Sequence, residues 1–188
     1  MKITLTIIIV SLTLVYSISQ NTNTSSDIYI LLKRINNIEI RDYKESLNAS
    51  YYSESETEKN NYFRNLASYI FGGNSKNETI SMTSPVTMRL YGDREMIFRM
   101  PEKYSLDNLP KADNPMINFL IVPSCKKAAI RYGGYSNDYI EGKKIKELKE
   151  VLRKNNISHT NRFEVLVYNA PYKIFNRRNE ITVNITYP

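Results

Sequence analysis

Two segments with helical periodicity, each placed between short alternating segments, constrain the fold of this chain most strongly. Residues 62–71 (YFRNLASYIF) carry apolar side chains at the i, i+3, i+4, i+7 and i+8 spacing of a helix with one apolar face. That face consists of Phe63, Leu66, Ala67, Ile70 and Phe71. Gly72 and Gly73 end the helix, because glycine adopts left-handed backbone angles at little steric cost. A second helix is expected from a cap at Asn137 or Asp138 to about Lys154. Its apolar face consists of Ile145, Leu148, Val151 and Leu152.

Short segments in which apolar and polar residues alternate flank both helices, and this period of two is typical of strands with one buried face. They are residues 38–43, 48–53, 80–90, 96–100, 116–123, 127–134, 162–169 and 180–185. Both halves of the chain therefore have the order strand, strand, helix, strand, strand. We predict an α+β fold, a distorted β-barrel of duplicated ββαββ units, with about eight antiparallel strands and two helices packed outside. Pro85, within ISMTSPVTMRL, cannot donate a ladder hydrogen bond, so it predicts a bulge or an edge strand.

Residues 1–19 have the layout of a secretory signal peptide, in which Lys2 precedes an apolar run that small residues follow. The run is shorter than the roughly 20 residues that cross a bilayer, which favours a signal peptide over the alternative, a membrane anchor. Residues 20–27 are a polar tail, and one domain is expected over residues 28–188. We therefore predict a secreted protein with no membrane span in its mature form. Candidate N-glycosylation sites, each opening an Asn-x-Ser/Thr triplet, are Asn23, Asn48, Asn77, Asn156 and Asn184.

The formal net charge of +7 favours an acidic partner, such as membrane headgroups or an anionic small ligand. Nucleic acid is not expected as a partner, because the basic residues are scattered and no zinc-ligand or helix-turn-helix pattern accompanies them. The lysines of the second helix form either a solvated face or a docking surface for an acidic membrane or protein. Cys125 is the single cysteine, so it stays free or pairs between molecules.

Five separated blocks of sequence resemble the SOUL haem-binding protein family in their order and spacing. They are IEIRDY, YIFGGN…ISMTSPVTM, IFRMPEKY…LP, AIRYGGY and YNAPYKIFNRRNEITV, and they cover roughly residues 28 to 186. The resemblance implies a duplicated ββαββ barrel, also seen in bacterial effector-binding domains, and non-enzymatic binding of haem or another porphyrin as a non-covalent ligand. It also implies a shallow apolar cleft between the first helix, at residues 62–71, and the loop at residues 171–179.

Haem is a flat apolar disc with two carboxylates at one edge, so its site needs apolar walls and nearby cations. The candidate ligand-binding residues are Tyr62, Arg64 and Tyr69 on the helix and Tyr172, Lys173, Ile174, Phe175, Arg177 and Arg178 in the loop. The apolar and aromatic members offer contact area, and the basic members are candidates to pair with the propionates. Alternatively, Arg177 and Arg178 form a solvated turn or hold the loop through backbone carbonyls. Tyr62 and Tyr69 are expected beside the cleft, because the apolar face of the helix packs on the sheet.

No residue is a clear axial ligand for iron. Some family members are proposed to use a histidine, but the single histidine here, His159, follows the second helix and lies in the half opposite the cleft. Met82 and Met88 are expected in the core and Cys125 in an exposed turn, so no metal site is predicted.

Glu180 either pairs with an arginine and fixes the loop or, if unpaired inside the barrel, recognises a cationic ligand or acts as a general base. No nucleophile or metal set accompanies it, so enzymatic activity is not predicted. The alternative function is an effector-type barrel that binds another amphipathic small molecule or a protein partner.

Overall fold

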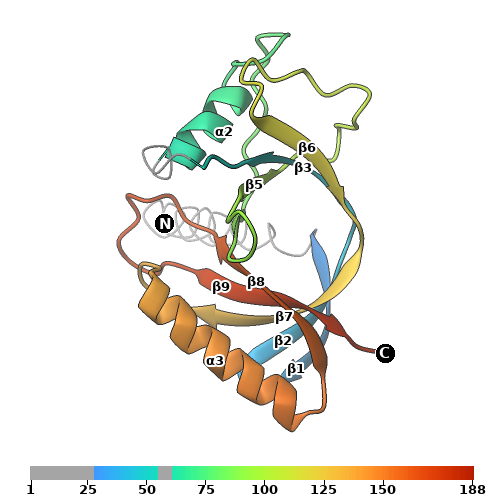
Figure 1. Ribbon diagram of the computed structural model, residues 1–188, viewed down its shortest axis with the longest axis vertical. Coiled ribbons are helices and arrows are strands. Elements are labelled where there is room, and N and C mark those ends of the chain that lie inside the picture. The colour runs from blue at the N-terminus through green and yellow to red at the C-terminus, as the bar shows by residue number, and fades with distance from the viewer. Residues whose placement is uncertain (1–27, 55–60) are drawn as a thin grey trace, which may run out of the picture.

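A computed structural model describes residues 28–54 and 61–188, and these residues form nine strands and two helices (Figure 1). The strands are β1 (Tyr29–Ile35), β2 (Ile38–Tyr43), β3 (Ser46–Tyr51), β4 (Val86–Arg89), β5 (Met96–Arg99), β6 (Ile117–Val122), β7 (Cys125–Tyr132), β8 (Ser158–Val167) and β9 (Asn179–Thr186). The helices are α2 (Tyr62–Ile70) and α3 (Asp138–Lys154). The predicted signal peptide and polar tail, and Asn23 with them, lie outside the described residues. Within the described residues, no helix combines the length and the apolar character needed to span a membrane.

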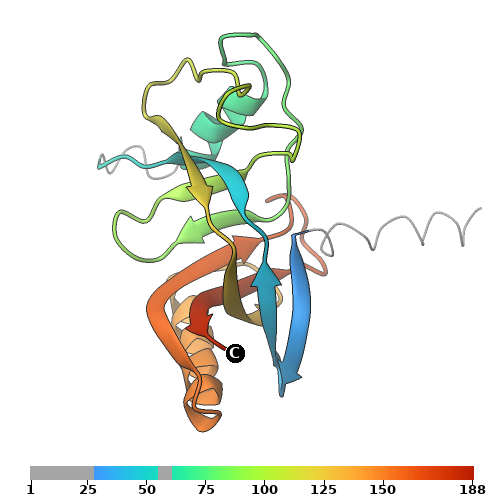
Figure 2. The ribbon, with the colours of Figure 1, turned by 90° about the vertical axis from the view of Figure 1, so that its right-hand side faces the viewer.

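The nine strands form a single antiparallel sheet in the order β1-β2-β7-β9-β8-β4-β5-β3-β6. β3 follows β2 after two residues, and β7 follows β6 after two residues. Because β2 pairs with β7 and β3 pairs with β6, these four strands form one long bent ribbon (Figure 2). β9, β8, β4 and β5 connect one half of this ribbon to the other, so the sheet curls round on itself. The predicted α+β class and the duplicated order are confirmed, while the barrel stays open, since no pairing among the described strands joins β1 to β6.

β1 is the strand that the sequence pattern did not predict, so the expected number of strands was one too low. It lies at an edge of the sheet, pairs with β2 and has a bulge between Leu31 and Lys33. Its consecutive apolar residues Ile30, Leu31 and Leu32 are all exposed. Because neither face of this strand is buried, its sequence does not alternate and a period of two does not reveal it.

Pro85 has a different place from the one predicted. β4 begins at Val86, directly after the buried Pro85, and it lies inside the sheet between β8 and β5. The prediction of a bulge or an edge strand was therefore wrong. The first residue before a ladder is an equally suitable place for proline, because no partner strand there requires its missing N–H.

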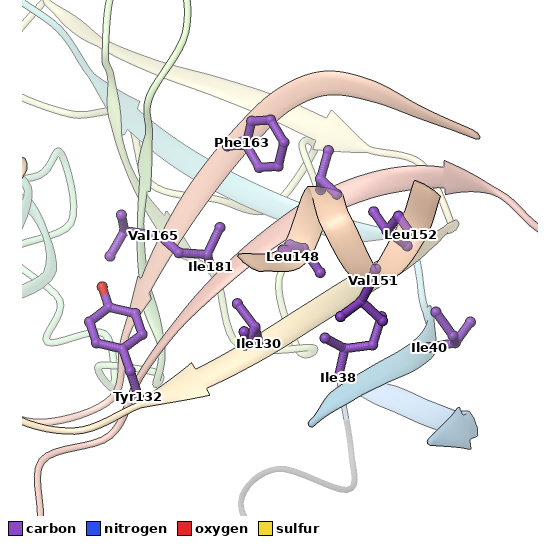
Figure 3. Close-up of a cluster of buried hydrophobic side chains, with 12 residues drawn as sticks. Ile38, Ile40, Ile130, Tyr132, Leu148, Val151, Leu152, Phe163, Val165 and Ile181 are labelled. Atoms are coloured by element: carbon purple, nitrogen blue, oxygen red, sulfur yellow. The ribbon is translucent and has the colours of Figure 1, made fainter. Parts of the chain in front are cut away.

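The two helices pack outside the curled sheet, as predicted, and each covers its own hydrophobic cluster. Beneath α3, Leu148, Val151 and Leu152 lie against Ile130 of β7 and Ile181 of β9 (Figure 3). α2 packs on β3 and β5 through a second cluster. The core of the molecule therefore consists of two clusters on the outer face of the sheet, one under α3 and the other under α2.

The α3 helix begins at the predicted cap. Asn137 has extended backbone angles, and its side-chain oxygen accepts a hydrogen bond from the Ile140 N–H at 2.9 Å. This bond satisfies one of the N–H groups that have no partner within the helix.

The apolar face of α2 differs from the predicted one. Leu66, Ala67 and Ile70 are buried as expected, but Phe63 and Phe71 are exposed, and Tyr62 and Tyr69 are buried in their place. The Tyr62 hydroxyl donates to the Ser53 carbonyl at 2.7 Å, and the Tyr69 hydroxyl donates to the Pro110 carbonyl at 2.9 Å. A tyrosine whose hydroxyl has a partner is buried as readily as a phenylalanine, and this is why the periodic pattern assigned the wrong face.

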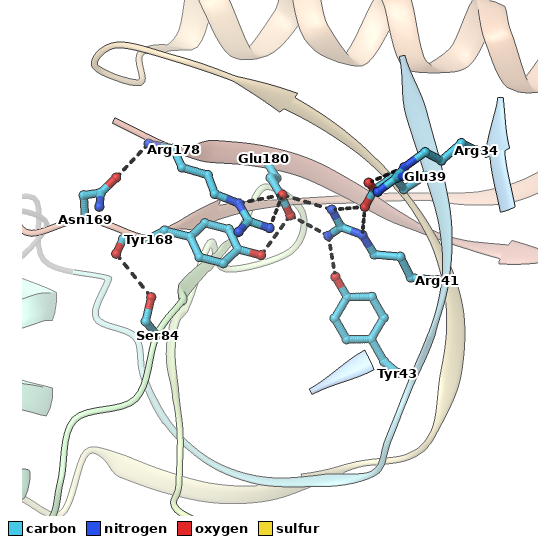
Figure 4. Close-up of polar contacts among 9 residues, drawn as sticks. All are labelled: Arg34, Glu39, Arg41, Tyr43, Ser84, Tyr168, Asn169, Arg178 and Glu180. Carbon is cyan, nitrogen blue, oxygen red and sulfur yellow. Dashed lines mark hydrogen bonds and ion pairs between the residues drawn. The ribbon is translucent and has the colours of Figure 1, made fainter. Parts of the chain in front are cut away.

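The inner face of the curled sheet carries charged side chains. Along β2, Ile38 and Ile40 join the cluster beneath α3, so the intervening Glu39 and Arg41 point to the inside of the curl. Figure 4 shows these side chains together with Glu180 of β9, on the side of the sheet away from α3. The fold therefore places apolar residues outside, under the helices, and charged residues inside.

Candidate functional site

A cleft of about 480 Å³ lies between α2 and the segment that follows β8. This volume is within the range of small-molecule sites. The residues that line it are Phe63, Met82, Thr83, Ser84, Val86, Met96, Val167, Tyr168, Asn169, Ala170, Pro171 and Arg177. It adjoins the helix and the loop between which the family resemblance implied a cleft, but Arg177 alone of the predicted ligand-binding residues lines it.

The walls of the cleft are apolar because three neighbouring strands each contribute one apolar side chain to it. Val86 of β4 lies opposite Val167 of β8 in the ladder, and Met96 comes from β5. Phe63 reaches the cleft from α2 and packs edge-on against Phe98, with ring centroids 5.4 Å apart. These residues leave apolar surface accessible to a ligand.

Arg177 holds together the segment that forms one wall of the cleft. Its guanidinium donates to the carbonyls of Ala170 at 2.7 Å and Lys173 at 2.8 Å, and it stacks on the ring of Tyr135 at 4.5 Å. The side chain is buried. Of the alternatives for Arg177, the structure therefore supports the one in which it holds the loop through backbone carbonyls.

Arg178 belongs to a buried network on the inner face (Figure 4). It donates to Glu180 Oε1 at 2.8 Å, and Arg41 donates to the same carboxylate through two bonds of 2.6 and 3.0 Å. The Tyr168 hydroxyl donates to Glu180 Oε2 at 2.9 Å, and the Arg178 guanidinium stacks on the Tyr168 ring. Glu180 is thus buried and paired, so the alternative of an unpaired general base is wrong.

Electrostatics keep this network in one charge state. Burial opposes ionisation of Glu180, but the hydrogen bond and charge of Arg41, followed by those of Arg178, outweigh it and hold the pKa of Glu180 below its ordinary value. Burial, and then the charge of Glu180, raises the pKa of Tyr168 well above its usual range. The carboxylate therefore stays charged and the phenol stays protonated, which preserves their hydrogen bond.

The remaining predicted site residues lie around the cleft without lining it. In the loop, Tyr172, Ile174 and Phe175 are 86%, 65% and 79% exposed. Lys173 and Arg64 are also exposed, and neither side chain forms a hydrogen bond or ion pair with any described residue. Tyr62 and Tyr69 are buried away from the cleft.

Sequence reasoning missed the residues that form the apolar walls. Phe63 was assigned to the core because it shares the helical period of Leu66, and Met82 because methionine commonly fills gaps in cores. The alternation of residues 80–90 and 96–100 did show which residues of each strand share a face. It gave no signal that Val86 and Met96 would lie at an open part of that face.

His159 and Cys125 lie away from the cleft. His159 is at the start of β8, whereas the cleft lies at the end of that strand, and its ring packs against Phe163. Burial and the charge of Lys149 lower the pKa of His159, and burial raises the pKa of the Cys125 thiol. Cys125 is half-buried rather than exposed. Within residues 28–54 and 61–188, no group of three or more His, Cys, Asp or Glu side chains could hold a metal ion.

One candidate glycosylation site does not fit the folded chain. Asn48 is 5% exposed, and its amide nitrogen, the atom that would carry the glycan, donates to the Ser46 carbonyl at 2.8 Å. Asn77, Asn156 and Asn184 are exposed and remain predictions.

Comparison with known proteins gives a family match over most of the chain. The family model described as SOUL heme-binding protein matches residues 26–184. Heme-binding protein 1 of Xenopus laevis and Heme-binding protein 1 of Xenopus tropicalis are each 26% identical to this chain over 124 residues. Each match covers 62% of this chain and 65% of the relative, so the chain spans less than two thirds of the length of these relatives.

Solved structures show the same fold at low sequence identity. The C-terminal domain of EcmrR superposes with a TM-score of 0.58 at 11% identity, covering 86% of this chain and 99% of that domain. A hydrolase from Listeria innocua superposes with a TM-score of 0.56 at 7% identity, covering 82% of this chain and 94% of that protein. At such identities the likeness concerns the fold alone.

Proposed function

This chain belongs to the SOUL haem-binding protein family, and from that premise we propose that it binds haem or a related porphyrin in the cleft between α2 and the segment after β8. The ligand is held non-covalently, by apolar contact with the ring and by pairing of its propionates with basic side chains. The protein acts as a binder and not as an enzyme, and it does so after secretion.

The observation that carries this proposal is the apolar cleft of about 480 Å³ at the position that the family resemblance implies. Phe63, Val86 and Val167 supply flat or branched apolar surface, which suits a planar aromatic ligand. A ring held by such contacts gains affinity in proportion to the apolar area that it removes from water.

Arg64 and Lys173 are the basic residues best suited to the propionates. Both are exposed cations without a partner among the described residues, one next to Phe63 on α2 and the other in the loop. Arg177 and Arg178 support the site indirectly, because their guanidinium groups are engaged with loop carbonyls and with Glu180. The iron receives no histidine from the described residues that line the cleft.

The test is an absorbance titration of the purified protein with hemin, comparing Met82→Glu with Met116→Glu. Met82 lines the cleft and Met116 does not, and both side chains are 45% exposed, so the pair is matched in chemistry and accessibility. We expect Met82→Glu to weaken hemin binding at least about tenfold, because a carboxylate in an apolar site costs more than about 1.4 kcal/mol. Met116→Glu should bind like the parent protein.

Hemin titrations of a further variant and of the parent distinguish the cleft from other possible sites and haem from other possible ligands. His159→Ala should bind hemin like the parent protein, and loss of binding in this variant would place the site at the start of β8. Equal affinities for Met82→Glu and Met116→Glu would remove the ligand from the cleft. A parent protein that shows no saturable binding of hemin would contradict haem as the ligand and favour another amphipathic molecule or a protein partner.

A further inference from the structure

A second, smaller cavity lies on the inner face of the curled sheet. Its volume is about 70 Å³, and it shares no lining residue with the cleft described above. This volume corresponds to roughly two water molecules, or one carboxylate or phosphate group. The strands β3, β4, β5, β7 and β8 all contribute to its walls.

The cavity carries an excess of positive charge. Its lining includes four cations, Lys44, Arg89, Arg99 and Lys127, and a single carboxylate, Glu164. Glu164 already pairs with Lys127 at 2.5 Å and with Arg89 at 3.9 Å. The negative charge within the lining therefore does not neutralise the cations that surround it.

Arg99 differs from the other half-buried and buried basic residues of the inner face. Arg41, Arg89 and Lys127 each have a carboxylate partner. The Arg99 guanidinium forms no hydrogen bond or ion pair with any residue in the described parts of the chain, although the side chain is half-buried. Burial lowers the pKa of Arg99, and the charge of Glu102 offsets this only in part.

An unpaired, partly desolvated guanidinium is costly, because its charge loses part of its hydration without gaining a partner from the protein. Its place in the fold adds one further donor. Thr87 of β4 lines the same cavity with its hydroxyl group, whereas the side-chain amide of Asn48, opposite Arg99 in the β3–β5 ladder, already donates to Ser46. Such an arrangement has the chemistry of a site for an oxyanion.

We propose that this inner cavity is an oxyanion site, in which Arg99 binds the carboxylate or phosphate group of a small anion. The planar fork of a guanidinium matches the two oxygens of such a group in a bidentate contact. The other cations of the lining strengthen the attraction, since they outnumber the single carboxylate among them. The site is independent of haem binding, which uses different residues.

The test is calorimetric titration of the purified protein with sodium phosphate and, separately, with sodium acetate, at constant ionic strength. The variant is Arg99→Gln, and the control is Arg131→Gln, which removes an exposed arginine that does not line this cavity. We expect saturable one-to-one binding of at least one probe by the parent and by Arg131→Gln, and a loss of at least about tenfold in Arg99→Gln. Which probe binds distinguishes a phosphate from a carboxylate as the group recognised.

Thermal unfolding provides a second readout. At about ten times its Kd, the bound probe should raise the Tm of the parent by about 3–6 °C and leave that of Arg99→Gln unchanged. Without the probe, Arg99→Gln should be at least as stable as the parent, because an unpaired charge has been removed. If that variant does not fold, Arg99→Lys keeps the charge but not the fork, and it should still weaken binding about fivefold or more.

Two results would overturn the oxyanion site. One is the absence of saturable binding of both probes by the parent protein up to tens of millimolar. The other is an equal effect of the probes on the parent and on Arg99→Gln or Arg99→Lys. Hemin titration of Arg99→Gln should match the parent, so a failure of this site and a failure of haem binding are distinguishable.

Discussion

The adjacent arginines Arg177 and Arg178 stabilise different parts of the molecule. Side chains of neighbouring residues in an extended segment point to opposite sides. Arg177 consequently reaches the loop carbonyls of Ala170 and Lys173, and Arg178 reaches the buried carboxylate of Glu180. Both charges are engaged within the protein, which leaves the exposed cations for contacts with a ligand.

Replacing Glu180 with glutamine should destabilise the protein strongly at neutral pH. The change removes the negative charge but leaves the cations of Arg41 and Arg178 in place on the inner face. Breaking a buried ion pair in this way typically costs about 3–5 kcal/mol. The free energy of unfolding in urea measures the loss, and Glu45→Gln, which changes an exposed glutamate, should remain within about 0.5 kcal/mol of the parent.

The difference in unfolding free energy between the parent and Glu180→Gln should depend on pH, and the lowered pKa of Glu180 fixes the direction of that dependence. A carboxyl group with a lowered pKa in the folded state stabilises the protein above its unfolded pKa of about 4.3, and this contribution is lost as the pH falls through the folded value. The difference in unfolding free energy between the parent and Glu180→Gln should therefore be constant near neutral pH and shrink as the pH falls below about 4.3. A difference that does not change with pH would contradict the role of the charge.

At the scale of single elements, α3 depends on Asn137, the capping residue directly before it. Asn137→Ala removes the side-chain oxygen that accepts from the Ile140 N–H, and it should lower the free energy of unfolding by about 1 kcal/mol, within a range of roughly 0.5–2. Asn137→Asp keeps an acceptor at this position and should stay within a few tenths of a kcal/mol of the parent. Urea denaturation distinguishes them, and equal losses in both variants would show that the cap bond does not stabilise the helix.

The helix α2 illustrates how far periodicity determines an element. Its spacing identified the helix and the buried positions of Leu66 and Ile70. It did not distinguish Phe63 from Tyr62, because a position at the border of the apolar face is buried or exposed according to what lies next to it. Ser53 and Pro110 supply the carbonyls that accept hydrogen bonds from the buried tyrosines. Both residues lie outside the helix, 9 residues from Tyr62 and 41 residues from Tyr69 in the chain, so the helical period carries no information about them.

At the scale of the whole molecule, the bent ribbon joins two separate cores. β2 and β7 belong to the cluster beneath α3, while β3 belongs to the cluster beneath α2. Because β2 continues into β3, neither cluster can unfold without disturbing the strands of the other. We therefore expect the described domain to unfold as one cooperative unit.

Leu66→Ala and Leu148→Ala test this expectation, because each removes a fully buried side chain from one cluster. Each should lower the free energy of unfolding by about 2–5 kcal/mol while keeping a single transition in urea, monitored by far-UV circular dichroism and by tyrosine fluorescence. Leu106→Ala, which truncates an exposed leucine, should stay within about 0.5 kcal/mol of the parent. Two separated transitions in either core variant would show that the halves unfold independently.

Local patterns along the chain predicted both helices, eight of the nine described strands and the duplicated order of the elements, and the spacing of the five blocks indicated the family. Helical spacing and alternation depend on local geometry, so they can be read from residues close together in the chain. The Asn137 cap followed from residue type, while the cleft that the family resemblance implied stays a prediction.

The folded arrangement of the strands, and no local pattern, sets which face of each element stays accessible and which charges have partners. Val86 and Met96 form a cleft wall because the sheet curls beside α2, and Glu180 is paired because β2 and β9 are separated by a single strand in the sheet. Arg99 is unpaired because no carboxylate from another strand reaches it. Burial and pairing depend on residues that are far apart in the chain, and local patterns carry no information about such contacts.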